Sequence, residues 1–485
     1  MSSGKTTASS GASGNVAKSG LWQMGGFALE RASQFIAQIF LARLLLPEDF
    51  GVWGMVLILT RLSNQFKDKA IASVLIYSGL EDKKLVNAVY SLTVNISIGM
   101  FLLQSLAGYP LSRFFAVPEV WPLSVCTAAV FLIGAGAGSH GAVLQRHMQF
   151  KELAIAEGLA GIARFATAII GAFLGWGVWA FALGEVAMSL VDAVCKRYFS
   201  KYPFQYHLIP EADSLQSVGG YMGKLVGGNL AVYTNTNSDN FFIGKLLGTS
   251  ALGFYSLAYQ LAMLPTFALA KINRVTFSVL SQRDAIGKRN FLVRNLELYG
   301  LCNAPIYGLG FLLAPWLIPT LYGEAWEPAV ILFQIILGFA YTRGFMAILG
   351  ITLNAINKPG VNATINWLLV VVSIPAFVVG AQLNGTTGVA IAALVVLGMG
   401  ATLWFWIVTC RAAHWDLSVL ARPILFPTLS LAAALYVAYV LPLPEETKPF
   451  LPAVAFLSLY VGAISIFSSG RAPRMLASLA MRFVR

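Results

Sequence analysis

Cysteine and histidine are scarce in this chain, because its 485 residues include only four of each. Zinc sites and disulfide frameworks need such residues at close spacing or in matching pairs. No CxxC pair occurs, and the residues are widely scattered: Cys126, Cys195, Cys302, Cys410, His140, His147, His207 and His414. The sequence therefore predicts no metal site and no disulfide.

Charge is equally scarce. Asp, Glu, Lys and Arg make up 11% of the chain, against about a quarter in soluble domains. Hydrophobic residues make up 57%, and the mean hydropathy is +0.72. The net charge of +12 could indicate nucleic acid, but the basic residues lie in short connections beside apolar segments, where membrane orientation and anionic headgroups explain them. We therefore expect no nucleic-acid partner.

Nucleotide-binding motifs are also lacking. Gly4-Lys5-Thr6 has no glycine at the position that a phosphate loop requires, and the GxGxxG match at residues 136–141 lies inside an apolar stretch, where close helix packing explains it better. Residues 1–20 are polar and rich in Ser and Gly, which predicts a flexible tail without the order of a signal peptide. We expect no catalytic residues and no cofactor.

The chain does contain long apolar runs. About 20 apolar residues in a helix cross the hydrocarbon core of a bilayer. Fourteen segments satisfy this, which predicts an all-α integral membrane protein: Trp22 to Leu46, Phe50 to Tyr77, Leu85 to Ala107, Val120 to Leu144, Leu153 to Gly175, Val178 to Val194, Tyr221 to Leu247, Leu252 to Val279, Leu296 to Leu317, Ala329 to Leu353, Val361 to Ala381, Gly388 to Val408, Pro423 to Val440 and Phe450 to Phe467.

Positive charge falls in alternate connections between these segments, and only Arg113 and Lys448 lie in the others. The positive-inside tendency then places both termini in the cytoplasm. The predicted organisation is a cytoplasmic tail (1–20), an N-lobe of six helices (21–200), a linker (201–219), a C-lobe of six helices (220–410), two further helices (411–470) and a basic tail (471–485).

An internal repeat supports the two lobes. Residues 41–53 align with 243–255 at an offset of 202, so that a basic residue, a Leu pair, a short turn, and a Gly followed two residues later by an aromatic recur in register. Gly177-Val178 and Gly388-Val389 give a second match. Because each copy holds an even number of helices, both keep the same orientation, as parallel repeats in transporters do.

These segments carry a family resemblance. The stretch FLARLLLPEDFGVWGM, the LQRHMQFK after the fourth segment and the LNAINKPG after the tenth resemble the Wzx-type bacterial polysaccharide exporters, in the MATE-like superfamily. The resemblance is strongest to the lipopolysaccharide, colanic-acid and teichuronic-acid branch. It implies a flippase of the bacterial inner membrane that moves an undecaprenyl-diphosphate-linked oligosaccharide to the outer leaflet. It also suggests polysaccharide polymerase and other assembly proteins as partners, besides membrane lipids.

Ionisable residues within spans are costly and are usually functional or paired. Arg31, Arg61 and Arg343 have no obvious partner in the sequence, and we expect them to bind the diphosphate, because Arg can hold phosphate with two hydrogen bonds. The further candidates for substrate binding also have structural explanations. Lys245 can extend from its helix end to the membrane interface, Lys67 and Lys69 can form a water-facing patch, and Arg164 can form an ion pair across helices.

Polar stripes add candidates for contact with sugar. Gln34 and Gln38 follow Arg31 on one face of the first segment, and Asn237 and Asn240 lie in the corresponding part of the seventh. The alternative is a buried hydrogen-bonded seam. For proton or sodium coupling the best-placed carboxylate is Asp239, followed by Glu30, although an ordinary hydrogen bond would explain Asp239 almost as well.

The predicted mechanism is alternating access by the two lobes. A MATE-type ion-coupled antiporter of small molecules is the main alternative, but a cationic drug would call for acidic cavity residues. A membrane glycan polymerase or ligase would need a long catalytic outer loop, and the longest outer connection here, residues 108–119, holds one Arg and one Glu. A purely structural scaffold would leave the intramembrane charges unexplained.

Overall fold

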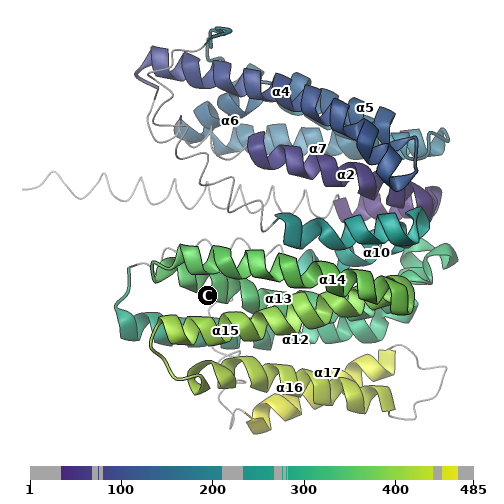
Figure 1. The fold of residues 1–485 in the computed structure, drawn as a ribbon, viewed down its shortest axis with the longest axis vertical. Helices are drawn as coiled ribbons and strands as arrows, with labels where there is room; N and C mark the ends of the chain where they lie inside the picture. Colours follow the sequence, from purple (N-terminus) through teal and green to yellow (C-terminus); the bar gives the residue numbers. More distant parts are fainter. Residues whose placement is uncertain are drawn as a thin grey trace, which may run out of the picture. The chain divides into compact units, whose positions relative to one another are not determined.

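The computed structural model describes residues 34–67, 75, 80–209, 233–266, 276, 280, 282–440 and 450–467. Within these ranges the chain forms helices joined by turns and contains no β-strand (Figure 1). The chain divides into two compact units. The first is Met1–Tyr233 with Gly248–Gly253, and the second is Thr234–Leu247 with Phe254–Arg485.

The first unit is a bundle in which α7 packs along α8, and α4 packs along α5 and α2. Asp82 begins α4 by accepting hydrogen bonds from the N–H groups of Lys84 and Leu85, which otherwise lack helical partners. The described helices of this unit are Gln34–Leu44, α2 (Pro47–Lys67), α4 (Lys83–Phe115), α5 (Val120–Ile133), α6 (Ala137–Arg146), α7 (Phe150–Phe173), α8 (Trp179–Ser200) and the beginning of α10 (Thr249–Ala262).

The segment Val120 to Leu144, predicted as one continuous span, is broken into α5 and α6 with a bend of 43°. Gly136 at the break has φ +74°, a left-handed conformation that glycine adopts without steric cost. Arg197 in α8 donates a hydrogen bond of 2.8 Å to the Ala135 carbonyl, which satisfies an acceptor that the bend releases. The glycine motif therefore serves a backbone bend and, in part, the close packing that we expected: a Cβ on Gly136 would overlap the Tyr90 ring of α4, whereas Gly138 has open space beside it.

A buried amide joins three helices of the first unit. Gln104 in α4 is fully buried, and its Nε2 lies within hydrogen-bond distance of Thr60 Oγ1 (3.2 Å), Ser124 O (3.2 Å) and Thr127 Oγ1 (2.9 Å). These acceptors belong to α2 and α5. Hydrogen bonds of this kind hold helices together where the surrounding lipid offers no hydrophobic driving force.

Two glycines allow the first turns of α2 and α10 to approach closely within the first unit. A Cβ atom on Gly51 would overlap the Thr249 carbonyl, and a Cβ on Gly253 would overlap the Pro47 carbonyl. Gly51 and Gly253 are matched by the 202-residue offset of the sequence repeat. Their contacts are therefore reciprocal, as two equivalent segments related by a local twofold axis would make.

The second unit is built around α13, which contacts the helices on either side of it in sequence. Of the most apolar 18-residue window of α13, 56% of the residues are buried, against 22–33% in the other long apolar helices. The described helices of this unit are residues 234–247, the remainder of α10, α12 (Ala285–Tyr322), η1 (Glu324–Trp326), α13 (Ala329–Ala355), α14 (Pro359–Ala392), η2 (Ala393–Gly400), α15 (Ala401–Ala412), α16 (Ser418–Val440) and α17 (Phe450–Phe467).

The long helical stretch from α14 to α15 contains a sharp reversal. Asn384 and Gly385 have non-helical backbone angles, and Gly380 and Gly388 lie so close that a Cβ on either would overlap the other's backbone. This break falls between the predicted segments Val361 to Ala381 and Gly388 to Val408. By contrast, α12 begins eleven residues before the predicted Leu296, so that part of the connection predicted between Val279 and Leu296 is helical.

Among the described residues, six helices are long and apolar enough to cross a membrane, or seven when the bent pair α5 and α6 counts as one span. The protein is therefore an all-helical membrane protein that crosses the bilayer several times.

Candidate functional site

A charged pocket lies in the first unit between the Gln34–Leu44 helix, α7 and α8. Its volume is about 290 Å³. The lining combines an amide, two carboxylates and two cations with small and apolar side chains: Gln34, Glu157, Gly161, Arg164, Phe165, Met188, Asp192 and Lys196. Two of the predicted substrate-binding residues, Gln34 and Arg164, thus share one pocket.

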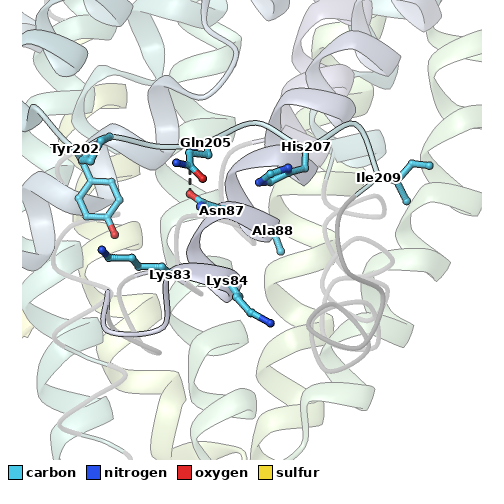
Figure 2. A pocket seen from close by; sticks show the side chains of 9 residues that line it. Lys83, Lys84, Asn87, Ala88, Tyr202, Gln205, His207 and Ile209 are labelled. Carbon is cyan, nitrogen blue, oxygen red and sulfur yellow. Dashed lines mark hydrogen bonds between the residues drawn. The ribbon is translucent and has the colours of Figure 1, made fainter.

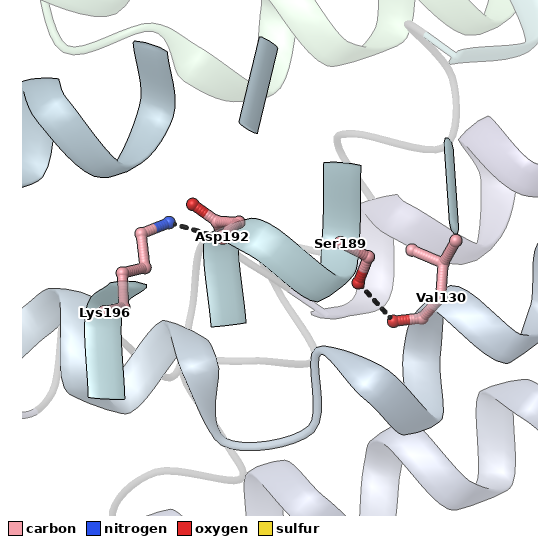
Figure 3. A network of polar contacts seen from close by, with 4 residues as sticks. All are labelled: Val130, Ser189, Asp192 and Lys196. Carbon is pink, nitrogen blue, oxygen red and sulfur yellow. Dashed lines mark hydrogen bonds and ion pairs between the residues drawn. The ribbon is translucent and has the colours of Figure 1, made fainter. Parts of the chain in front are cut away.

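Ion pairs organise the charges of this pocket. Arg164 in α7 pairs with Glu185 in α8, and Lys196 Nζ lies 2.8 Å from Asp192 Oδ2 one turn earlier in α8. All four side chains keep 16–30% of their surface exposed, so water still reaches them. Figure 3 shows the Asp192 pair beside the hydrogen bond from Ser189, a residue of the same helix. Because the pairs are partly solvated, each contributes little to stability.

A second polar site lies within the second unit. Asp239 Oδ2 accepts a hydrogen bond of 2.8 Å from the Tyr255 hydroxyl, and both side chains are buried. Arg343 in α13 donates to the Tyr259 hydroxyl at 3.1 Å and to Thr236 Oγ1 at 3.0 Å. The rings of the two tyrosines lie 6.0 Å apart. The network therefore brings two predicted residues, Asp239 and Arg343, into one polar cluster.

The helix at residues 233–247 is unusually polar for a buried segment. Asn235, Asn237, Ser238, Asp239 and Asn240 are each less than 10% exposed. The Asn235 Nδ2 atom donates to a carbonyl in α14. Within the described part of the chain, three buried oxygens of this helix have no hydrogen-bond partner: Asn235 Oδ1, Ser238 Oγ and Asn240 Oδ1. Buried acceptors without partners are costly, so this helix is suited to binding water, a cation or a hydroxylated ligand.

The other predicted residues are not among the side chains that form these two clusters. Arg61 in α2 and Lys245 at the end of its helix are exposed. Gln38 is half-buried, and its Nε2 has no hydrogen-bond partner among the described residues. Glu30, Arg31 and Lys69 lie outside the described residues, as does the side chain of Lys67.

Sequence reasoning did not include the partners of the candidate residues. Tyr255 and Tyr259 lie in an apolar segment, where an aromatic residue is indistinguishable from ordinary core. Glu185 and Asp192 are recognisable as intramembrane acids, but spacing along one helix cannot show that Arg164 pairs with Glu185 in the next helix rather than with Glu157 in its own.

Comparisons with known proteins give a consistent result. A family model described as "Polysaccharide biosynthesis protein" matches residues 40–331. The chain is 25% identical to the lipopolysaccharide biosynthesis protein WzxC of Escherichia coli (strain K12) over 364 residues, which cover 73% of each chain. It is 24% identical to the succinoglycan biosynthesis transport protein ExoT of Rhizobium meliloti (strain 1021) over 324 residues, which cover 65% of this chain and 63% of that relative.

Solved structures give the fold. The lipid II flippase MurJ, in an inward closed conformation, aligns with a TM-score of 0.72 at 16% identity and covers 92% of this chain and 98% of its own. A point mutant of the Vibrio cholerae MATE transporter VcmN aligns with a TM-score of 0.54 at 16% identity, over 84% and 98% of the two chains. At such identities the likeness establishes a MATE-like membrane fold and nothing finer.

Proposed function

Because the chain belongs to the polysaccharide biosynthesis protein family, we propose that it is a flippase. Its substrate is an undecaprenyl-diphosphate-linked oligosaccharide, carried from the cytoplasmic to the outer leaflet for exopolysaccharide or lipopolysaccharide synthesis. It works in the bacterial inner membrane with both termini in the cytoplasm. Polysaccharide polymerase and other assembly proteins act beside it. It performs transport rather than a chemical reaction.

The observation that carries this proposal is the environment of Arg343. This half-buried guanidinium lies near the middle of α13 and is held by two neutral hydroxyl groups, Tyr259 and Thr236. Within the described ranges it forms no ion pair with a carboxylate. A cation in the middle of a membrane helix is energetically costly, and such residues usually serve a function. Its remaining N–H donors suit an anionic diphosphate, for which planar Arg has the matching geometry.

The topology that we propose has fourteen helices: two six-helix bundles related by the sequence repeat, and two C-terminal helices. The repeat, the alternation of positive charge and the reversal at Gly385 support this count. The two bundles alternate between inward and outward access, which is how transporters with internal repeats commonly work. The glycan passes through a polar lumen while the prenyl chain stays in lipid.

Energy comes from proton or sodium coupling at a carboxylate, or from consumption of the product in the outer leaflet. Asp239 is the first candidate for coupling, because its carboxylate is buried. The residues on either side of it carry the oxygens Ser238 Oγ and Asn240 Oδ1, which have no hydrogen-bond partner in the described part of the chain. Such oxygens are chemically suited to bind a small cation. Glu30 is the alternative.

An ion-coupled antiporter of small molecules is the second candidate. It is favoured by the shared MATE-like fold and by the carboxylates Glu157 and Asp192 in the pocket of the first unit. The positive charge of the Arg343 guanidinium opposes a cationic cargo in direct contact with it. A glycan polymerase or ligase is the third and weakest candidate, because the described outer connections are short.

The test is flipping by the purified full chain in liposomes with a fluorescent undecaprenyl-diphosphate oligosaccharide, read as the fraction that becomes accessible to a membrane-impermeant glycosidase on the outside. We expect flipping to exceed that of protein-free liposomes. Liposomes with MATE-type drug cargo and an imposed sodium or proton gradient form the opposing arm. The proposal would be overturned if the protein exchanges drug but flips none of several glycans. It would also be overturned if the protein converts the glycan into a polymerised product.

A further inference from the structure

A cavity of about 590 Å³ lies in the first unit, where the first turns of α4 face the segment that follows α8. We call this segment, residues 201–209, the strap. The cavity is distinct from the pocket that holds Gln34 and Arg164. Figure 2 shows Lys83 and Asn87 of α4 facing Tyr202 and Gln205 of the strap, while the Lys84 side chain extends away from the strap. The described lining contains two lysines, two amides and a histidine but no carboxylate: Lys83, Lys84, Asn87, Ala88, Tyr202, Pro203, Gln205, His207 and Ile209.

The polar face of α4 holds the strap in place. Asn87, Ser91 and Asn95 recur every four residues, so they lie along one side of the helix. Asn87 Oδ1 and Ser91 Oγ accept hydrogen bonds from the backbone N–H groups of Gln205 (3.1 Å) and His207 (2.9 Å). The Asn95 amide donates to a carbonyl further along the strap at 2.9 Å. Extended backbone beside a membrane helix needs such partners, and α4 supplies them.

Apolar packing fixes the other side of the strap. The ring of Phe204 stacks on Tyr90 with centroids 4.7 Å apart, and it packs on a buried cluster that includes Val86 and Val89. The strap is thus fastened by hydrogen bonds and by an aromatic contact. The backbone at Gln205 and His207 is therefore held in place before any ligand binds, and a preformed site loses less free energy on binding.

The charge at the cavity is positive. Lys83 and Lys84 both line it, whereas the adjacent Asp82 side chain accepts two backbone N–H groups at the beginning of α4 and is not part of the lining. In the strap, Leu208 is 73% exposed and Ile209 is 86% exposed, and Ile209 lines the same cavity as the two lysines. Cations adjoining exposed apolar side chains match an amphiphile that has a phosphate headgroup and a hydrocarbon tail.

We propose that this cavity binds the diphosphate headgroup of the lipid-linked substrate at the membrane surface before translocation. The inference rests on the proposed function and adds a loading site to it, on the side that the sequence predicts to be cytoplasmic. Lys83 and Lys84 bind phosphate oxygens as point charges, the Asn87 and Gln205 amides donate further hydrogen bonds, and Ile209 contacts the first units of the tail.

The test measures binding of undecaprenyl diphosphate to the full chain in detergent by native mass spectrometry. The variant Lys83→Gln with Lys84→Gln removes both charges and largely preserves side-chain size. We expect it to bind about tenfold or more weakly, since both charges that hold the phosphate oxygens are lost. The matched control, Lys151→Gln with Lys358→Gln, removes two exposed lysines of other connections on the same predicted side and should bind as the wild type does.

Two competitors identify the ligand. Inorganic diphosphate should displace the lipid from the wild type, and phosphatidylglycerol at the same concentration should not. Equal displacement by phosphatidylglycerol would assign the site to bulk anionic lipid and overturn the proposal. Unchanged binding in the Lys83/Lys84 variant, or an equal loss in the control, would also overturn it.

Flipping, measured in parallel, separates this inference from the function on which it rests. A wild-type protein that flips, together with a Lys83/Lys84 variant that binds and flips normally, refutes the loading site alone. A wild-type protein that does not flip, but whose binding depends on the two lysines, refutes the proposed flippase and leaves a diphosphate site.

Discussion

Gly51 and Gly253, which are 202 residues apart, lie so close that a Cβ atom on Gly253 would be 3.3 Å from the Gly51 nitrogen. Beside them, Ser250 Oγ donates a hydrogen bond of 3.0 Å to Glu48 Oε1, a pair with the same separation in sequence. The two segments that the sequence repeat aligns therefore contact each other through equivalent positions. Close backbone approach at such a point requires residues without a side chain.

The first prediction concerns these glycines. Gly51→Ala and Gly253→Ala should each destabilise the protein by about 1–3 kcal/mol or more, because the added methyl group overlaps a backbone carbonyl that cannot move away freely. Thermal unfolding in detergent measures this. Gly158→Ala in α7 is the control, since a Cβ there meets nothing within 4 Å. Wild-type stability in both variants would contradict the close approach.

The second prediction concerns Arg343. Arg343→Gln should abolish flipping while leaving folding and membrane level intact, whereas Arg343→Lys should keep part of the rate, because the charge remains but the two-pronged geometry is lost. The exposed Arg411→Gln serves as control. The sequence assigns the same role to Arg31 and Arg61. Normal export by the triple Gln variant would show that these arginines are structural.

The third prediction concerns the bond between Tyr255 and Asp239. Tyr255→Phe removes the hydroxyl that donates to the buried Asp239 carboxylate and should cost about 1–3 kcal/mol of stability. Asp239→Asn should remove any proton or sodium dependence of flipping, measured at several pH values with and without sodium. A variant that keeps the wild-type response to both ions would exclude Asp239 from coupling, which leaves Glu30 or passive flipping driven by product consumption.

The fourth prediction concerns the pair formed by Arg164 and Glu185. Because both side chains are partly exposed, a double-mutant cycle with Arg164→Gln and Glu185→Gln should give a coupling energy of about 1 kcal/mol or less in unfolding. Flipping discriminates further. If Arg164 also contacts substrate, Arg164→Gln should slow flipping more than Glu185→Gln does. If both substitutions slow flipping equally, and the double variant Arg164→Glu with Glu185→Arg restores the rate, the contact is purely structural.

The fifth prediction concerns Gln104. Gln104→Leu removes the buried amide that joins α4 to α2 and α5 and should lower stability by about 1–2 kcal/mol. The same substitution at the exposed Gln145 should have little effect. Equal stability of the Gln104 variant and the wild type would show that the three acceptors find other donors within the bundle.

Several features were predictable from residues alone. Long apolar runs and alternating positive charge predicted a helical membrane protein, and the short motifs predicted the Wzx-type family, which the family match confirms. Expected boundaries were least accurate where helices extend beyond the apolar core, as α4 does beyond Ala107 to Phe115. Hydropathy cannot detect this extension, because a stretch that contains Gly108, Pro110 and Arg113 is compatible with either a helix or a loop.

The candidate sites divide in the same way. Composition marked Arg343, Asp239 and Arg164, because a charged residue in an apolar run is visible without a structure. Composition could not identify Tyr255, Tyr259 or Glu185 as the partners of these residues. It also could not show that the strap packs on α4. Periodicity determines which residues share a face of one helix. Which side chain meets that face depends on how different helices pack, and only the tertiary structure decides that.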